Sequence, residues 1–192
     1  MLSTLQEEKL DPRVKRTRSL ILRSFEEILP QKGFQAVSVQ DITDKAGINR
    51  ATFYAHFPDK YALLDHSIHL LFRQEIENRM LDACHYSDEN LKALIIMVCE
   101  FISNANSHCT PSEPQFESLV EAQAKNQLQG LLQVWLEKED STVDPKTAAT
   151  AASWAVYGLA LQWSHDKSKN RPSAEKFAEQ VLPLIAASLK TI

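Results

Sequence analysis

The sequence predicts an all-α fold of about nine helices. Only four of its 192 residues are glycine, and long stretches lack the alternating β-branched residues that mark strands. Apolar residues instead recur at three- and four-residue spacing along most of the chain, which is the period of a helix with one buried face. A composition of 44% hydrophobic and 24% charged residues is enough for one or two buried cores.

The first helix is predicted between Pro12 and Gly33, after a polar arm (residues 1–11) that we expect to be frayed. Proline suits the first turn of a helix, and glycine is a common stop. The apolar positions of this helix follow the helical period: Val14, Leu20, Ile21, Phe25, Ile28 and Leu29.

Two short helices, 38–46 and 49–57, are predicted around a glycine turn. Ser38 is a capping residue with Asp41 three positions later, and a carboxylate there favours the positive end of a helix. Gly47 allows a left-handed turn without steric cost, and Asn49 can cap the second helix. The expected small core of this region consists of Phe34, Val37, Ile42, Ile48, Phe53 and Phe57.

The rest of the chain predicts longer helices. One helix is expected from Lys60 to about Ala83, and a second begins after the capping residue Ser87. A third is expected over 116–139, preceded by a capping box of Ser112 and Gln115. The last two are expected over 144–165 and from Ser173 to Leu189, with a kink at Pro183 in the final helix.

The balance of charged residues changes sign near residue 60, where the long helices begin. Lys and Arg number 10 against 8 Asp and Glu over residues 1–60, but 11 against 17 over residues 61–192. We therefore predict two domains, 1–59 and 60–192. Basic residues gather on the first helix, where they suit contacts with phosphate or a plain solvated face: Arg13, Lys15, Arg16, Arg18 and Arg23.

The run AGINRATFYAHFPDKYALL, preceded by SVQDITDK, closely resembles the DNA-binding domain of TetR/AcrR-type transcriptional regulators. The resemblance covers roughly the N-terminal quarter to third of the chain. It departs from the family pattern at Asn49, where serine is usual, and at Ala51, where glycine is frequent. The methyl group of Ala51 falls where the backbone would approach DNA. The resemblance implies a helix-turn-helix domain followed by a larger helical domain for effector binding and dimerisation.

Residues of both short helices are candidates for DNA contact. Arg50, Gln40 and Thr52 have side chains that suit guanine, adenine and thymine, respectively. The resemblance implies phosphate contacts for Tyr54, His56 and Lys60, and Ser38 with the backbone N–H of Val39 suits a phosphate at a helix start. For Tyr54 and His56 the alternative is packing against the next helix.

The last two helices predict a dimer interface. Residues 147–163 are apolar almost all round, more than one neighbouring helix needs. The resembled family pairs its last two helices into an intersubunit four-helix bundle, and the alternative is an ordinary core. The predicted interface residues are Trp154, Tyr157, Gly158, Leu161, Phe177, Val181, Leu184 and Ile185.

The middle helices predict an effector pocket if the resemblance extends to them. Its expected lining is Met97, Phe101, Phe116, Leu119, Gln123 and Trp135, an apolar set with a polar anchor. The same stripe also fits a plain core. Glu100, Glu117 and Glu121 lie nearby in the sequence and would favour a cationic effector, or they are ordinary exposed charges.

Metal, catalytic and membrane functions have little support in the sequence. Cys84, Cys99 and Cys109 are odd in number and lack CxxC spacing, and we expect reduced thiols. A metal site would require the fold to bring together His66, His69, Cys84, His85, His108 and Cys109. No catalytic motif, cofactor motif, signal peptide or membrane span is apparent, so we predict a cytoplasmic protein that is not an enzyme and has no cofactor.

Together these observations predict a homodimeric repressor that binds a palindromic operator and is released from it by a small-molecule effector. Two alternatives keep part of this hypothesis. One is a helix-turn-helix factor regulated by a protein partner, and the other is a helical metal sensor.

Overall fold

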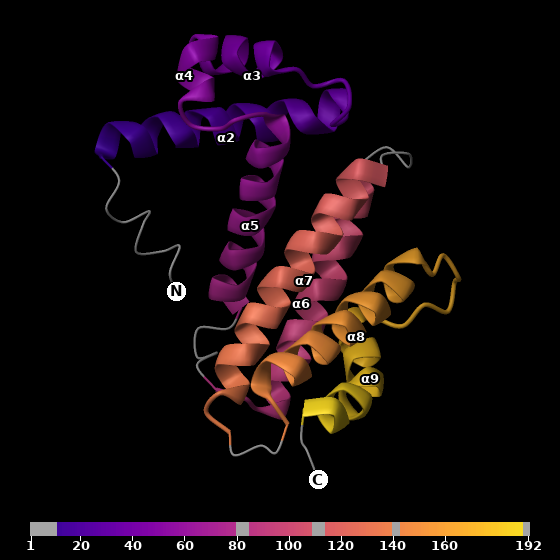
Figure 1. Cartoon of the computed structure of the whole chain (residues 1–192). Helices are drawn as coiled ribbons and strands as arrows, with labels where there is room; N and C mark the ends of the chain where they lie inside the picture. Colours follow the sequence, from indigo (N-terminus) through magenta and orange to yellow (C-terminus); the bar gives the residue numbers. More distant parts are fainter. Residues whose placement is uncertain (1–10, 80–84, 109–113, 140–142, 190–192) are drawn as a thin grey trace. The chain divides into compact units, whose positions relative to one another are not determined.

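The computed structural model describes residues 11–79, 85–108, 114–139 and 143–189. Every regular element in these ranges is an α-helix, which confirms the predicted fold class, and eight helices are present there, α2 to α9 (Figure 1), against about nine expected. The described residues form two compact units, 11–67 and 68–189 without the gaps. None of the described helices is long and apolar enough to cross a lipid bilayer.

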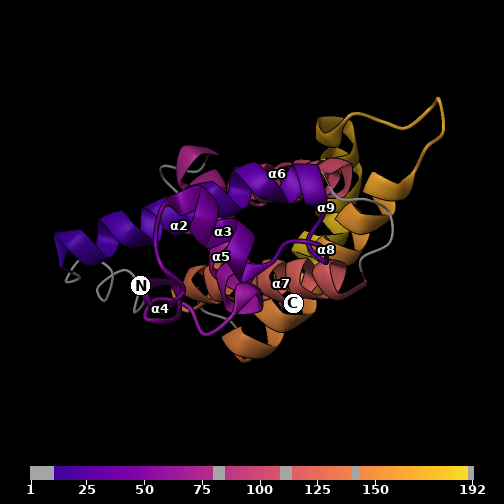
Figure 2. The ribbon, with the colours of Figure 1, turned by 90° about the horizontal axis from the view of Figure 1, so that it is seen from above.

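Three helices make up most of the first unit: α2 (Pro12–Lys32), α3 (Val39–Ala46) and α4 (Arg50–Tyr54). Figures 1 and 2 show α3 lying against α2, with α4 following the turn after α3. Pro12 occupies the first turn of α2, and Gly33, with φ of 73°, ends that helix as predicted.

The helix α4 is shorter than the predicted span 49–57. After Tyr54 the chain tightens, and the backbone N–H of His56 donates to the carbonyl of Phe53 three residues back. Pro58 limits the helix further on, because a proline disfavours helical backbone angles in the residue before it, here Phe57. The sequence pattern located the helix but overestimated its length.

Aromatic rings dominate the core of the first unit. Phe25, Phe34 and Phe53 are fully buried, and Phe25 meets Phe34 edge to face with ring centroids 6.4 Å apart. Phe53 and Phe57 lie 6.1 Å apart. The predicted core is therefore confirmed except at Ile48, which is only half-buried.

The helix α5 (Lys60–Arg79) begins in the first unit and ends in the second. Its first two turns pack on the segments before α3 and after α4: Tyr61 lies 5.2 Å from Phe34 and His66 lies 5.6 Å from Phe57, between ring centroids. These contacts explain why the first compact unit extends to Ser67, beyond the predicted domain boundary at residue 59.

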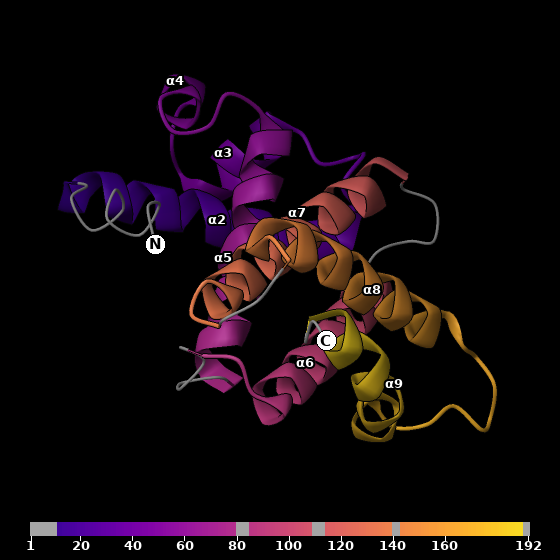
Figure 3. The ribbon, with the colours of Figure 1, turned by 60° about the horizontal axis from the view of Figure 1, so that its bottom comes forward.

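The second unit contains α6 (Asp88–His108), α7 (Pro114–Leu136), α8 (Pro145–His165) and α9 (Ala174–Leu189). α8 lies against α6, α7 and α9, and α6 also lies against α9 (Figure 3). As predicted, Ser87 caps α6 and Asp144 caps α8, each side-chain oxygen accepting from a backbone N–H three residues on. Ser112, part of the predicted capping box, lies outside the described residues.

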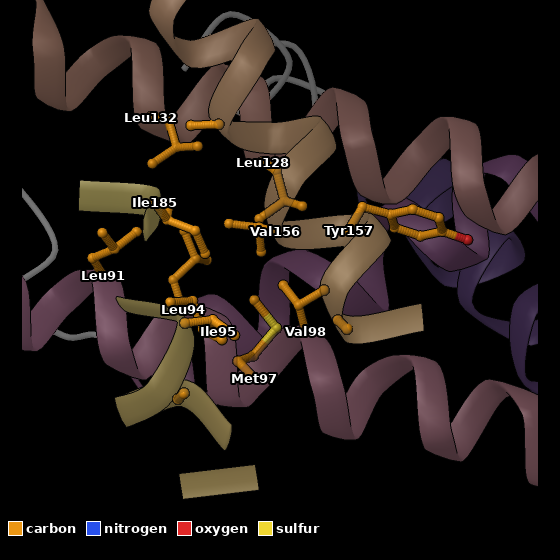
Figure 4. Close-up of a cluster of buried hydrophobic side chains, with 14 of the residues drawn as sticks. Leu91, Leu94, Ile95, Met97, Val98, Leu128, Leu132, Val156, Tyr157 and Ile185 are labelled. Carbon is orange, nitrogen blue, oxygen red and sulfur yellow. The ribbon is translucent and has the colours of Figure 1, made fainter. Parts of the chain in front are cut away.

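The core of the second unit draws aliphatic side chains from all four of these helices. Figure 4 shows Leu94 and Val98 of α6, Leu128 of α7, Val156 of α8 and Ile185 of α9 around one shared interior. Each of these residues is at most 1% exposed. Many aliphatic contacts, together with buried rings such as Trp135 and Phe72, therefore hold this unit together.

Candidate nucleic-acid interface

A reciprocal cap fixes the start of α3. The backbone N–H of Asp41 donates to Ser38 Oγ (3.1 Å), and the backbone N–H of Ser38 donates to Asp41 Oδ2 (3.0 Å). Lys32, at the end of α2, pairs with Asp41 Oδ1 at 2.7 Å. The hydrogen bond from Lys32, followed by those from Ser38, lowers the pKa of the Asp41 carboxyl to about 2. The predicted cap is confirmed, and the Lys32 contact also joins it to α2.

The turn between α3 and α4 has the expected geometry. Gly47 adopts a left-handed conformation, with φ of 67° and ψ of 33°, which only glycine enters without cost. Asn49 Oδ1 then accepts from the backbone N–H of Thr52 at 2.7 Å and from its hydroxyl at 2.9 Å. A helix of only five residues is thus oriented by a side-chain cap.

The outward face of these two helices is polar and aromatic. Arg50, Ala51 and Tyr54 are all exposed, and Arg50 Nη2 donates to the Tyr54 hydroxyl at 3.2 Å. Gln40, also exposed, donates through Nε2 to Asp44 Oδ1 at 2.6 Å. These side chains carry hydrogen-bonding groups of the kind that read base edges or contact phosphate.

Thr52 and Val39 are less available than the sequence suggested. Both are half-buried, and the Thr52 hydroxyl already donates its proton to Asn49. Arg50 and Gln40 are therefore the better placed of the three candidates for base contact, and a methyl contact is the role that suits Thr52.

His56 lies at the edge of this face. It is half-buried, and its pKa is lowered first by burial and then by the charge of Arg18. The guanidinium of Arg18 lies 5.1 Å from the centre of the Phe57 ring. The first-helix residue Arg18 therefore belongs beside His56, a neighbourhood that the sequence did not reveal. Tyr54, in contrast, is 47% exposed, which disfavours the alternative that it packs against the next helix.

Lys60, the first residue of α5, makes contacts that the resemblance did not imply. Its ammonium donates to three backbone carbonyls, those of Phe34 (2.9 Å), Gln35 (3.0 Å) and Val37 (2.9 Å). An ammonium has three donors, and all three are used. In this structure the ammonium is therefore engaged by the backbone, and the expected phosphate contact of Lys60 stays a prediction.

The residues of the expected effector lining lie at different depths and along the length of α7. Leu119 and Trp135 both lie on α7, sixteen positions apart, which at 1.5 Å per residue is about 24 Å. Met97 and Trp135 are fully buried in the core of the second unit, and the ring of Phe101 packs edge to face on Phe72. Gln123 and Leu119 are half-buried, and the side chain of Phe116 lies outside the described residues. The effector lining therefore stays a prediction, and a ligand that touched both Leu119 and Trp135 would have to be elongated.

The expected dimer residues divide into outward and inward groups. Trp154 is 61% and Leu184 70% exposed, whereas Val181 and Ile185 are at most 6% exposed. Gly158 is exposed, Leu161 and Phe177 are half-buried and Tyr157 is buried. The buried residues belong to the core of their own subunit, since helix faces alternate every three or four residues. The Lys125 ammonium lies 3.5 Å from the centre of the Trp154 ring.

The candidate metal ligands do not converge in the described part of the chain. The His66 ring packs on Phe57, and His69 Nδ1 lies 2.6 Å from Gln127 Nε2. No group of three or more His, Cys, Asp and Glu side chains among the described residues is arranged to hold an ion. Cys84 and Cys109 lie outside the described residues, while Cys99 is buried, and burial raises the pKa of its thiol to about 12.

Comparison with known proteins identifies the first unit. Residues 21–66 match the family described as "Bacterial regulatory proteins, tetR family". The chain is 40% identical over 60 residues to the uncharacterized HTH-type transcriptional regulator YxbF of Bacillus subtilis, a match that spans 31% of this chain but only 16% of that protein. It is 26% identical over 162 residues to the HTH-type transcriptional regulator EthR of Mycolicibacterium smegmatis, covering 83% of this chain and 74% of that protein.

The fold similarity extends over nearly the whole chain. The structure of Thermus thermophilus FadR, described as a TetR family transcriptional repressor in complex with lauroyl-CoA, has a TM-score of 0.59 at 18% identity. It covers 91% of this chain and 96% of that one. At this level of identity the comparison establishes the shared fold.

Proposed function

We propose that this chain, a helix-turn-helix transcriptional regulator of the tetR type, acts as a homodimeric repressor that a small-molecule effector releases from a palindromic operator. The observation that carries the proposal is the exposed face of α3 and α4, where Arg50 and Gln40 project from two helices held in place by side-chain caps. Rigidly held polar side chains on a helix face are what base readout requires.

Arg50 is assigned the main role in base readout, since arginine can donate two hydrogen bonds to guanine. Selection of bound sequences from random DNA should yield a two-fold symmetric motif. Arg50→Ala should then lose about 1 to 3 kcal/mol more on that motif than on random DNA. Arg16→Ala is the matched control, because Arg16 is exposed on α2 and a phosphate contact there would weaken binding to both DNAs alike. Equal losses for Arg50→Ala on both DNAs would remove it from base readout.

Dimerisation is assigned to the outward face of α8 and α9. One recognition helix reads few base pairs, so a two-fold dimer on half-sites about 34 to 36 Å apart is the expected geometry. Trp154, Gly158 and Leu184 are exposed on these helices, and Gly158 leaves room for close helix approach: a Cβ built there meets nothing within 4 Å inside the subunit.

Charge in this face should dissociate the dimer. Leu184→Asp is expected to shift sedimentation at micromolar concentration from dimer to monomer, because a carboxylate would be buried without a partner. The control is Val134→Asp, a similar change at an exposed valine of α7. A dimeric Leu184→Asp would move the interface elsewhere.

The effector is assigned to the second unit, whose interior is built from four helices and the end of α5. The lauroyl-CoA complex of Thermus thermophilus FadR supports the idea that this fold accepts small molecules. The dimer can adopt conformers in which the distance between its two DNA-binding units does not match the operator half-sites. An effector that binds such a conformer more tightly must lower operator affinity, because the coupling free energy between the two binding sites is reciprocal. Screening compounds for release of the selected DNA tests this assignment, and release by a protein but by no compound would contradict it.

A further inference from the structure

We propose that Lys60 is a positioning residue, which holds the loop before α3 so that the start of α3 can meet a DNA phosphate. The proposal rests on the DNA-binding function proposed above. It replaces direct phosphate contact by Lys60 with an indirect role, exerted through Ser38 and the backbone N–H of Val39.

Three hydrogen bonds of Lys60 are directed at the loop before α3. Its Nζ lies 2.9 Å, 3.0 Å and 2.9 Å from the carbonyl oxygens of Phe34, Gln35 and Val37. The same nitrogen lies 4.8 Å from the centre of the buried Phe34 ring, a distance at which a cation is attracted to an aromatic face. Lys60 therefore contacts both the backbone and a side chain of one short loop.

Other contacts also hold this loop, since Phe34 is buried against Phe25 and Tyr61. Gly33 ends α2 with φ of 73°, and the N–H of Val37 donates to the carbonyl of Gly33 at 3.2 Å. Lys60 adds hydrogen bonds to carbonyls within this turn. Three carbonyl oxygens that point at one place repel each other, and the carbonyls of Phe34 and Val37 are in part-buried hydrogen bonds. An ammonium at their meeting point removes the repulsion and satisfies all three acceptors.

The loop that Lys60 contacts leads directly into the start of α3, so Lys60 can affect the position of α3. Val37 is directly followed by Ser38, the cap of α3, and by Val39, its first residue. Lys60 is itself the first residue of α5. A single side chain thus ties the first turn of α5 to the segment that leads into the proposed phosphate-binding end of α3.

Substitution by arginine separates the two roles of Lys60. Arginine binds phosphate at least as well as lysine, but its planar fork does not match three carbonyls that converge on one point. If Lys60 positions the loop, Lys60→Arg should resemble Lys60→Met, with operator affinity lowered about tenfold or more by the misplaced α3. If Lys60 binds phosphate, Lys60→Arg should retain wild-type affinity.

Two further measurements read the positioning role directly. The slope of log affinity against log salt should be unchanged in Lys60→Met, whereas loss of a phosphate-bound cation lowers it by about 1. Amide hydrogen exchange of a peptide spanning residues 33–42, measured without DNA, should become faster in both variants while exchange in α8 stays the same. Lys15→Met, at an exposed lysine of α2, controls for loss of charge in the same domain. If Lys60→Met does not fold, Lys60→Arg carries the same measurements.

Full operator affinity in Lys60→Arg, or a slope reduced by about 1 with unchanged exchange, would overturn the proposal. If the wild-type protein shows no preference for any DNA sequence, the proposed DNA-binding function is refuted. Faster hydrogen exchange in the Lys60 variants would in that case still support the contact between Lys60 and the loop.

Discussion

The two units of this molecule are stabilised in different ways. In residues 11–67 a few capping side chains and phenylalanine rings fix short elements: Asp41 with Ser38, Asn49 with Thr52, and Phe25 with Phe34. In residues 68–189 long helices share a broader core, in which many aliphatic side chains surround rings such as Trp135. The small unit depends on individual residues, whereas the large unit depends on the sum of many similar contacts.

This difference in stabilisation suits the functions proposed for the two units, which are DNA contact for the small unit and effector binding for the large one. A side chain that reads a base must be held within a fraction of an ångström. A core built from many interchangeable apolar contacts can repack at modest cost, which suits a unit proposed to accept a ligand.

The largest expected difference between the units comes from the aromatic core of the small one. Phe53→Ala removes a fully buried ring and should cost about 3 to 5 kcal/mol, comparable to the whole stability of so small a unit. All three tryptophans, Trp135, Trp154 and Trp163, lie in the other unit. Unfolding followed by tryptophan fluorescence should therefore keep its wild-type midpoint while DNA binding is lost.

Leu94→Ala, in the large unit, is the converse control. It should lower the fluorescence midpoint, because Leu94 is fully buried in the core that surrounds Trp135. If Phe53→Ala lowers that midpoint equally, the two units unfold together and the contrast between them does not hold.

A smaller effect is expected from the caps. Asn49→Ala should cost about 1 kcal/mol and weaken operator binding, because α4 has only five residues and this cap orients it. Asp144→Ala removes the equivalent cap of α8, a helix of 21 residues, and should lower stability similarly without changing DNA affinity. Thermal unfolding and DNA titration of both variants test the difference, which disappears if Asp144→Ala weakens DNA binding as much.

The smallest expected effect is a dependence of the stability of the small unit on pH in the acid range. The pKa of Asp41 is lowered from 3.8 to about 2 in the folded state, so folding favours the carboxylate. Its contribution is complete above about pH 4 and is lost as the pH falls toward 2. Circular dichroism of Asp41→Asn should show a shallower loss of stability than wild type over this range. If the stability of the two proteins falls equally over this pH range, Asp41 makes no such contribution.

The sequence predicted those features that depend on residues close together in the chain. Ser38, Gly47 and Asn49 were assigned correctly because a cap or a left-handed turn is decided within three or four residues. The helices after Pro58 were located for a similar reason, since their apolar period and breakers are local. The length of α4 was overestimated at its end, where the chain tightens after Tyr54.

Predictions that needed distant contacts were less successful. Lys60 meets carbonyls 23 to 26 positions away, and nothing local announces such a contact. Val181 and Ile185 share an apolar stripe with the exposed Leu184, and an apolar residue looks the same in a sequence whether it faces its own core or a second subunit. The effector lining stays a prediction for the same reason, because an apolar stripe does not distinguish a cavity from a filled core.

By itself, the amino-acid sequence determined the helical class, the caps and turn of the helix-turn-helix, and the exposure of Arg50, since each follows from periodicity and steric preference within a few residues. Only the tertiary structure decided which partner each long side chain takes: the carbonyls for Lys60, Arg18 beside His56, and Lys32 on Asp41. The physical reason is that a flexible charged side chain has many possible partners of similar energy, and packing determines which of them lies within reach.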